Sequence, residues 1–226
     1  MAMAQTEQSL IPHIAPASVV HWYFDFISPF AYLQSKRLKE LPVSDIEFQP
    51  VLFAGLLKHW GNLGPAEISP KRRFTYRYVV WSAQRHDIPL QVPPAHPFNP
   101  LKVLRLCLGL GSSPDVVTKI FDFIWQQGRD PNQDWPLLCA ELGISVDDAE
   151  QLISSEQVKQ RLRQNTELAI NAGVYGVPTL SINSENFWGV DATDMAADYL
   201  CNPQAFESSE MQRVSDLPIA SERPRD

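Results

Sequence analysis

The residue best placed to take part in a reaction is Ser28. It lies between an apolar, β-branched stretch and a run of residues with helical spacing. Val19–Phe26 predicts a buried strand, and Phe30–Leu41 predicts a helix with one apolar face. Ser28 is a natural N-cap for that helix, and Pro29 suits its first position. Free N–H groups and the positive helix end favour an anion there, such as a thiolate whose pKa a hydroxyl donor would lower further. A capping role alone is the competing interpretation.

Two later segments could bind a ligand's backbone and charged end. In Gly176-Val177-Pro178-Thr179 a proline opens a predicted strand, where its missing N–H costs little. A cis bond after Val177 would present its N–H and C=O to an extended ligand. Asp191 lies between a strand and the last predicted helix, where it could hold an ammonium group or simply cap the helix.

The composition excludes several classes of protein. The chain has 226 residues, 44% of them hydrophobic, a net charge of −7 and three cysteines. The acidic balance argues against nucleic-acid binding, and no apolar run is long enough for a membrane span. The three cysteines are far apart, so neither a disulfide framework nor a metal site is expected. Residues 1–18 have the composition of a disordered extension and not of a secretion signal.

The elements that must position these residues alternate strands and helices. Asp45–Phe53 predicts a second strand, parallel to the first across a helical crossover. Residues 71–172 are mostly helical in pattern, apart from a proline-rich loop at 88–100. Strands return at 179–183 and 186–188, followed by a helix at about 192–200. The polar tail beyond Phe206 is expected to be disordered. This order predicts an α/β fold, a thioredoxin-like domain with an inserted all-helical domain.

Five motifs carry a family resemblance. In collinear order between about residues 19 and 201, the chain reads YFDFISPFAYL, GNLGPAEISPKR, PPAHPFNPL, YGVPTL and FWGVDATDM. It resembles the 2-hydroxychromene-2-carboxylate isomerases, relatives of the kappa-class glutathione transferases. The resemblance implies a thioredoxin-like domain at 19–53 plus 158–202, a helical insertion at 54–157 and a C-terminal tail at 203–226.

The resemblance also implies a cofactor, glutathione, and a reaction. The reaction is glutathione-dependent isomerisation of 2-hydroxychromene-2-carboxylate to trans-o-hydroxybenzylidenepyruvate in aromatic degradation. Ser28 matches the reactive serine, and Val177 matches the residue that pairs with the glutathione backbone. The γ-glutamyl end is matched by Val190, Asp191, Ala192 and Thr193, although the family often has Arg where Ala192 stands. Substrate contacts are matched by Lys58, Asn62 and His96.

Alternatives remain open at several of these positions. A kappa-like glutathione transferase would use the same thiolate on another electrophile. A third class, the thiol–disulfide oxidoreductases, is largely excluded, because that reaction needs a nucleophilic cysteine at the helix start, where this chain has Ser28 and Ala31. The basic cluster Lys71, Arg72, Arg73, Arg77 and Arg85 could meet an anionic substrate or form a solvated helix face. We expect a cytoplasmic homodimer that acts on a small-molecule substrate.

Overall fold

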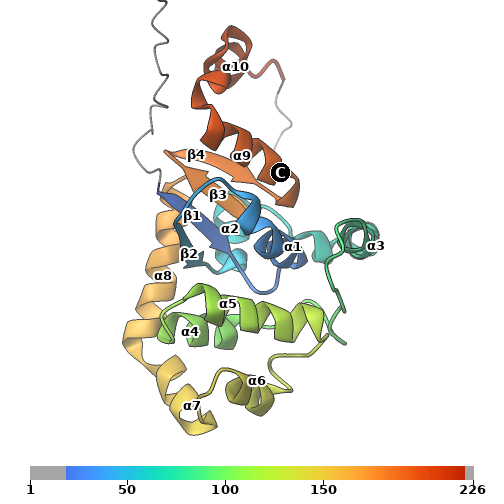
Figure 1. Cartoon of the computed structure of the whole chain (residues 1–226), viewed down its shortest axis with the longest axis vertical. Helices are drawn as coiled ribbons and strands as arrows, with labels where there is room; N and C mark the ends of the chain where they lie inside the picture. The colour runs from blue at the N-terminus through green and yellow to red at the C-terminus, as the bar shows by residue number, and fades with distance from the viewer. Residues whose placement is uncertain (1–18, 222–226) are drawn as a thin grey trace, which may run out of the picture.

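A computed structural model describes residues 19–221 and centres on a four-stranded sheet of order β2-β1-β3-β4 (Figure 1). β1 pairs in parallel with β2 and antiparallel with β3, and β3 pairs antiparallel with β4. The parallel pair confirms the predicted strand–helix–strand unit. The strands are β1 (Val20–Phe24), β2 (Ile46–Pro50), β3 (Thr179–Ile182) and β4 (Glu185–Trp188).

The helices surround this sheet unevenly. Figure 1 shows α4 to α7 on one side of it, α8 running from them back to the sheet, α9 on the other side, and α3 set apart beside α1. The α-helices are α1 (Pro29–Arg37), α2 (Phe53–Trp60), α3 (Ser69–Arg85), α4 (Leu101–Gly109), α5 (Pro114–Phe121), α6 (Trp135–Glu141), α7 (Val146–Ser154), α8 (Glu156–Asn171), α9 (Thr193–Cys201) and α10 (Ser209–Ser215). Short 3-10 turns cover Leu38–Glu40, Pro65–Glu67, Val190–Ala192 and Pro203–Glu207, and a π-helical turn covers Asp122–Gln126.

The inserted helices share one hydrophobic core with the sheet. Trp22 and Phe24 on β1 are fully buried in the same cluster as Leu104 of α4, Phe121 of α5 and Leu138 of α6. The ring centroids of Phe24 and Phe121 lie 5.6 Å apart. The helical segment is therefore packed onto the sheet and does not stand apart as an independently cored unit. The boundaries at 53/54 and 157/158 stay predictions.

The structure corrects two sequence-based expectations. The second strand was expected to continue to Phe53, but it ends at Pro50 and Phe53 begins α2. A short apolar run cannot be assigned to strand or helix by periodicity alone. In addition, the Phe53 N–H bonds the side chain of Asp25, which is distant in sequence. The tail was expected to be unstructured, but Ser208 caps α10 there by accepting the Met211 N–H. The expectation for residues 1–18 lies outside the described residues.

Candidate functional site

Ser28 lies where β1 gives way to α1, as the local sequence predicts. Its hydroxyl oxygen accepts the Ala31 N–H at 3.2 Å, which makes it the N-cap, and Pro29 occupies the first helical position. The same hydroxyl donates to the Val177 carbonyl oxygen at 3.4 Å. Only 6% of Ser28 is exposed. The hydroxyl is therefore a nearly buried group at a helix N-terminus, where a negative charge is favoured.

Val177 faces Ser28 from the loop before β3. The Val177–Pro178 peptide bond is cis, and Val177 itself is buried. A single extended tripeptide that touches both residues requires them to lie within roughly 10 Å, at about 3.5 Å per residue. The 3.4 Å contact between the two residues meets that condition.

Asp25 organises the turn that carries Ser28. Its carboxylate accepts the Ile27 N–H at 3.1 Å and the Phe53 N–H at 2.9 Å, and its carbonyl accepts the Ser28 N–H at 3.0 Å. Burial raises the pKa of the Asp25 carboxyl to about 7, although the two backbone hydrogen bonds oppose the rise. One buried carboxyl group thus ties the Ser28 turn to the start of α2.

The helical insertion holds the opposite side of the same turn. The Trp125 indole N–H donates to the Phe26 carbonyl at 2.9 Å, and the His96 Nε2 lies 2.7 Å from the Ile27 carbonyl. The His96 and Trp125 rings also contact each other, with centroids 5.3 Å apart. Two consecutive carbonyl groups of the Ser28 turn are therefore bonded by side chains that come from the insertion.

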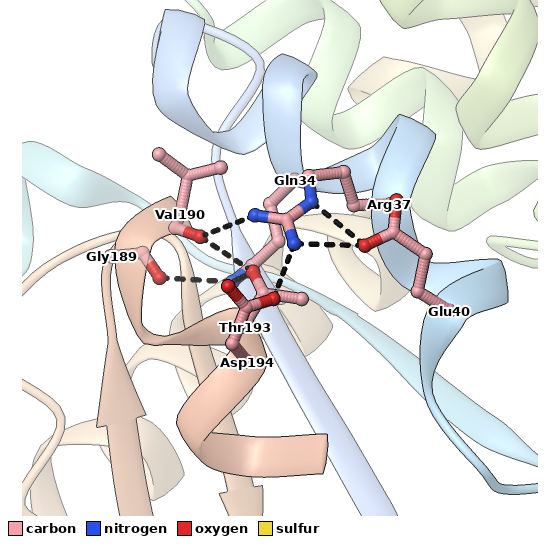
Figure 2. A network of polar contacts seen from close by, with 7 residues as sticks. All are labelled: Gln34, Arg37, Glu40, Gly189, Val190, Thr193 and Asp194. Carbon is pink, nitrogen blue, oxygen red and sulfur yellow. Dashed lines mark hydrogen bonds and ion pairs between the residues drawn. The ribbon is translucent and has the colours of Figure 1, made fainter. Parts of the chain in front are cut away.

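The segment from Gly189 to Asp194 is anchored by α1 (Figure 2). The buried Gln34 amide donates to the Gly189 carbonyl at 3.0 Å and to the Thr193 hydroxyl at 3.1 Å. Arg37 pairs with Asp194 and also approaches the Val190 carbonyl at 3.5 Å. The position of this segment relative to Ser28 is therefore set by two polar side chains of the helix that Ser28 caps.

The four residues expected to contact the γ-glutamyl end differ in how accessible they are to a ligand. Asp191 is exposed, and its carboxylate forms no hydrogen bond or ion pair within residues 19–221. Val190 is buried, and its carbonyl accepts the Thr193 hydroxyl at 2.6 Å. The Ala192 N–H donates to the Gly189 carbonyl, and the Thr193 N–H donates to the Val190 carbonyl. The Asp191 carboxylate is the group of this set that a ligand can reach without displacing an internal bond.

The expected substrate contacts lie on two different segments. Lys58 is exposed near the end of α2, and Asn62 is exposed just after that helix, with its N–H on the Leu57 carbonyl. α2 is joined to the Ser28 turn through Asp25 and Phe53. His96 contacts that turn directly, but both of its ring nitrogens have partners inside the protein.

A basic, aromatic groove runs along α3. It encloses about 470 Å³, and none of its lining residues belongs to the Ser28 turn. Phe74 and Trp81 are 68% and 53% exposed, and the basic side chains of α3 form no ion pair with any described residue. The groove is lined by Pro70, Arg73, Phe74, Arg77, Tyr78 and Trp81.

Sequence reasoning missed the residues that position the site. Gln34 lies four positions after Phe30 on the face predicted to be apolar, so a polar residue on that face was the available signal. Asp25 is the one charged residue of the first strand segment, which was a second signal. The Tyr76 hydroxyl lies 2.7 Å from His96 Nδ1, 20 positions away, and the Trp125 indole bonds a carbonyl 99 positions away, so neither residue carries a comparable local signal. Within residues 19–221 no group of His, Cys, Asp and Glu has the arrangement of a metal site, and no helix is long and apolar enough to cross a membrane.

The fold and the Ser28 turn together define a thioredoxin-like protein of the DsbA class. Residues 19–201 match the family model described as DSBA-like thioredoxin domain, which confirms the predicted fold class. A solved 2-hydroxychromene-2-carboxylate isomerase superposes with a TM-score of 0.70 at 28% identity, covering 84% of this chain and 100% of its own.

Curated relatives narrow the assignment. The 2-hydroxychromene-2-carboxylate isomerase of Pseudomonas putida is 31% identical over 84% of this chain and 100% of its own length. Glutathione S-transferase kappa 2 of Caenorhabditis elegans is 26% identical over 82% of this chain and 92% of its own. The chain belongs to the 2-hydroxychromene-2-carboxylate isomerase family, as the five motifs predicted.

Proposed function

We propose that this protein is a glutathione-dependent isomerase that converts 2-hydroxychromene-2-carboxylate to trans-o-hydroxybenzylidenepyruvate in the degradation of aromatic compounds. The observation that carries the proposal is the Ser28 hydroxyl at the N-terminus of α1, beside the Val177 backbone. The family relationship to named isomerases and kappa-class transferases supports the reaction and the cofactor.

The donors and acceptors of the site suit a bound glutathione. Ser28 contacts Val177 at 3.4 Å, a long and weak hydrogen bond that a ligand could replace at little cost. A cysteinyl N–H could then bond the Val177 carbonyl, and the Ser28 hydrogen could turn towards the sulfur. The exposed Asp191 carboxylate suits the ammonium group of the γ-glutamyl end.

Ser28 supports the chemistry by stabilising a negative charge. Bound glutathione would supply a thiolate for reversible addition to the conjugated double bond of the substrate. Once the ring C–O bond has opened and the hemiketal proton has passed to the phenolic oxygen, the former double bond could rotate as a single bond, and loss of the thiolate would restore it in the trans form. The Ser28 hydroxyl would donate to the sulfur whenever the sulfur is anionic. The N–H groups and dipole of α1 would favour the same charge, so more thiolate would form near neutral pH.

The substrate side involves residues beyond the thioredoxin-like core. Lys58 would pair with the substrate carboxylate, and Asn62 would bond an oxygen of the ring or of its open-chain form. Both are exposed at the end of α2, which Asp25 ties to the Ser28 turn. His96, which the family resemblance also places near the substrate, lies against that turn.

We also propose a cytoplasmic homodimer. Cytoplasmic glutathione keeps thiols reduced, and all three cysteines are free, with Cys107 and Cys139 buried. The exposed aromatic groove of α3 is the candidate contact with a second copy, because exposed apolar patches commonly mark interfaces.

Isomerisation of hydroxychromene carboxylate, followed by ultraviolet absorbance with and without glutathione, tests the function. Turnover that requires glutathione and leaves its concentration unchanged is the expected result. Turnover without glutathione would refute the mechanism. The alternative, a kappa-like transferase, predicts consumption of glutathione with an electrophile such as a halogenated nitrobenzene.

A further inference from the structure

Both ring nitrogens of His96 are held by specific partners. Nε2 lies 2.7 Å from the Ile27 carbonyl oxygen, and Nδ1 lies 2.7 Å from the Tyr76 hydroxyl. A carbonyl oxygen can only accept, so Nε2 must carry the hydrogen. In the neutral ring Nδ1 then accepts, and the Tyr76 hydroxyl donates to it. Burial lowers the pKa of His96, which favours this neutral form.

The contact with Ile27 survives a change in protonation. A protonated ring would donate from Nδ1 to the Tyr76 oxygen, and the Tyr76 hydrogen could turn to the His96 carbonyl, which lies 3.1 Å away. The Nε2–H donates to the Ile27 carbonyl in either case. His96 therefore has no free nitrogen with which to exchange a substrate proton.

The Ile27 carbonyl belongs to the same peptide plane as the Ser28 N–H. That N–H donates to the Asp25 carbonyl at 3.0 Å, while His96 holds the other edge of the plane. The preceding carbonyl, of Phe26, is held by Trp125. The orientation of this peptide sets the backbone of the N-cap, and thereby the direction of the Ser28 hydroxyl.

We propose that His96 is a positioning residue, which holds the Ile27–Ser28 peptide and so aims the Ser28 hydroxyl, and that it does not contact the substrate. It couples the helical insertion, through Tyr76 of α3, to the Ser28 turn. This inference rests on the proposed function and assigns His96 a role different from the substrate contact that the family resemblance implies.

The replacement His96→Gln separates the two roles. A glutamine side chain can place its Nε2–H where the histidine Nε2–H lies, but it cannot act as an acid or base. His96→Gln should keep the thiol pKa of bound glutathione and the kcat within about twofold of the original protein. His96→Ala should raise that thiol pKa by about half a unit to one unit and lower kcat near pH 7 by roughly three- to tenfold.

Two further measurements keep the test decisive. Thiolate absorbance of the glutathione complex against pH reports the thiol pKa without the isomerisation. Amide hydrogen exchange at Ile27 and Ser28 needs no glutathione, and it should accelerate about tenfold in His96→Ala but not in His96→Gln. Tyr76→Phe removes only one hydroxyl and should shift the same quantities in the same direction by a smaller amount, which covers the case of an unfolded His96→Ala.

Distinct outcomes overturn the two proposals. If His96→Gln loses as much kcat as His96→Ala while the thiol pKa and amide exchange are unchanged in both, His96 acts on the substrate and the positioning role is wrong. Unchanged amide exchange in His96→Ala and Tyr76→Phe would also refute it. A protein that turns over without glutathione refutes the proposed function instead, and the exchange data still decide the role of His96.

Discussion

The Ser28 hydroxyl lies 3.4 Å from the carbonyl oxygen of Val177, although 149 positions separate the two residues in the chain. The antiparallel pairing of β1 with β3 produces this proximity, because Tyr23 near the end of β1 is opposite Thr179 at the start of β3. The loops that follow β1 and precede β3 therefore meet at one edge of the sheet. A backbone carbonyl and a helix-capping hydroxyl are thus presented together to any ligand at that edge.

Replacement of Ser28 tests whether its hydroxyl donates a hydrogen bond to the glutathione thiolate. A hydrogen bond to a charged group is worth about 1.5–3 kcal/mol, so Ser28→Ala should raise the bound thiol pKa by roughly one to two units. Activity near pH 7 should fall about ten- to hundredfold and recover partly at higher pH. The pH–rate profile measures this. The matched control is Ser35→Ala on the same helix, because the Ser35 hydroxyl bonds only the Tyr32 carbonyl. Full activity of Ser28→Ala at pH 7 would exclude the mechanism.

Replacement of Asp191 tests recognition of the γ-glutamyl end. The carboxylate is exposed, and exposed ion pairs contribute at most about 1 kcal/mol, so Asp191→Ala should weaken glutathione binding roughly fivefold. The kcat at saturating glutathione should stay within about twofold, because this contact changes little during the reaction. Isothermal titration gives the affinity. Asp198→Ala, an exposed aspartate on α9, should change neither quantity, and equal affinities for the two variants would contradict the assignment.

Gln34 should matter for both stability and binding. Its side chain is fully buried and bonds the Trp22 indole at 2.8 Å as well as the Gly189–Thr193 segment. Gln34→Ala leaves these buried groups unpaired, so the free energy of unfolding should fall by about 2–4 kcal/mol. Urea unfolding measures the change, with the exposed Gln151→Ala as control. Glutathione affinity should weaken in parallel. A fall in the free energy of unfolding below about 0.5 kcal/mol would show that the Gly189–Thr193 segment does not depend on Gln34 for its position.

Asp25 should make stability depend on pH in an unusual direction. The pKa of Asp25 in the folded state is about 7, well above its usual range, because the carboxyl is buried. Between about pH 4 and 7 the folded protein therefore binds a proton that the unfolded chain has released. The stabilisation is fully present below about pH 4 and is lost as the pH rises through about 7. Relative to Asp25→Asn, the unfolding free energy should fall by on the order of 3–4 kcal/mol between pH 4 and 7. Urea unfolding at several pH values tests this, and parallel curves for the two proteins would contradict the raised pKa.

The α3 groove should form the contact between two copies of the chain. Light scattering is expected to report about twice the chain mass of 25.5 kDa at micromolar concentration. Phe74→Glu places a charge in the exposed aromatic face and should shift the protein to a monomer. Leu168→Glu, at a similarly exposed apolar residue on α8, should leave the dimer intact. A protein that is a monomer at micromolar concentration would contradict the dimer, and a Phe74→Glu dimer would exclude this face.

The sequence by itself determined the elements whose signals are local. An N-cap, a proline at the first helical position and an apolar, β-branched strand are neighbours in the chain, so the Ser28 turn could be predicted from adjacent residues. The order of strands and helices was enough for the thioredoxin-like class. The start of α2 was missed because its first N–H bonds Asp25, a partner 28 positions away.

Only the tertiary structure decided what holds the site in place. The partners of Gln34 lie 12, 155 and 159 positions away, and those of His96 lie 20 and 69 positions away. No local pattern specifies such pairs, because a buried polar side chain bonds whichever group the packed elements bring to it. The position of Ser28 at the helix start could therefore be predicted from its immediate neighbours, whereas its orientation depends on helices that pack against it from distant parts of the chain.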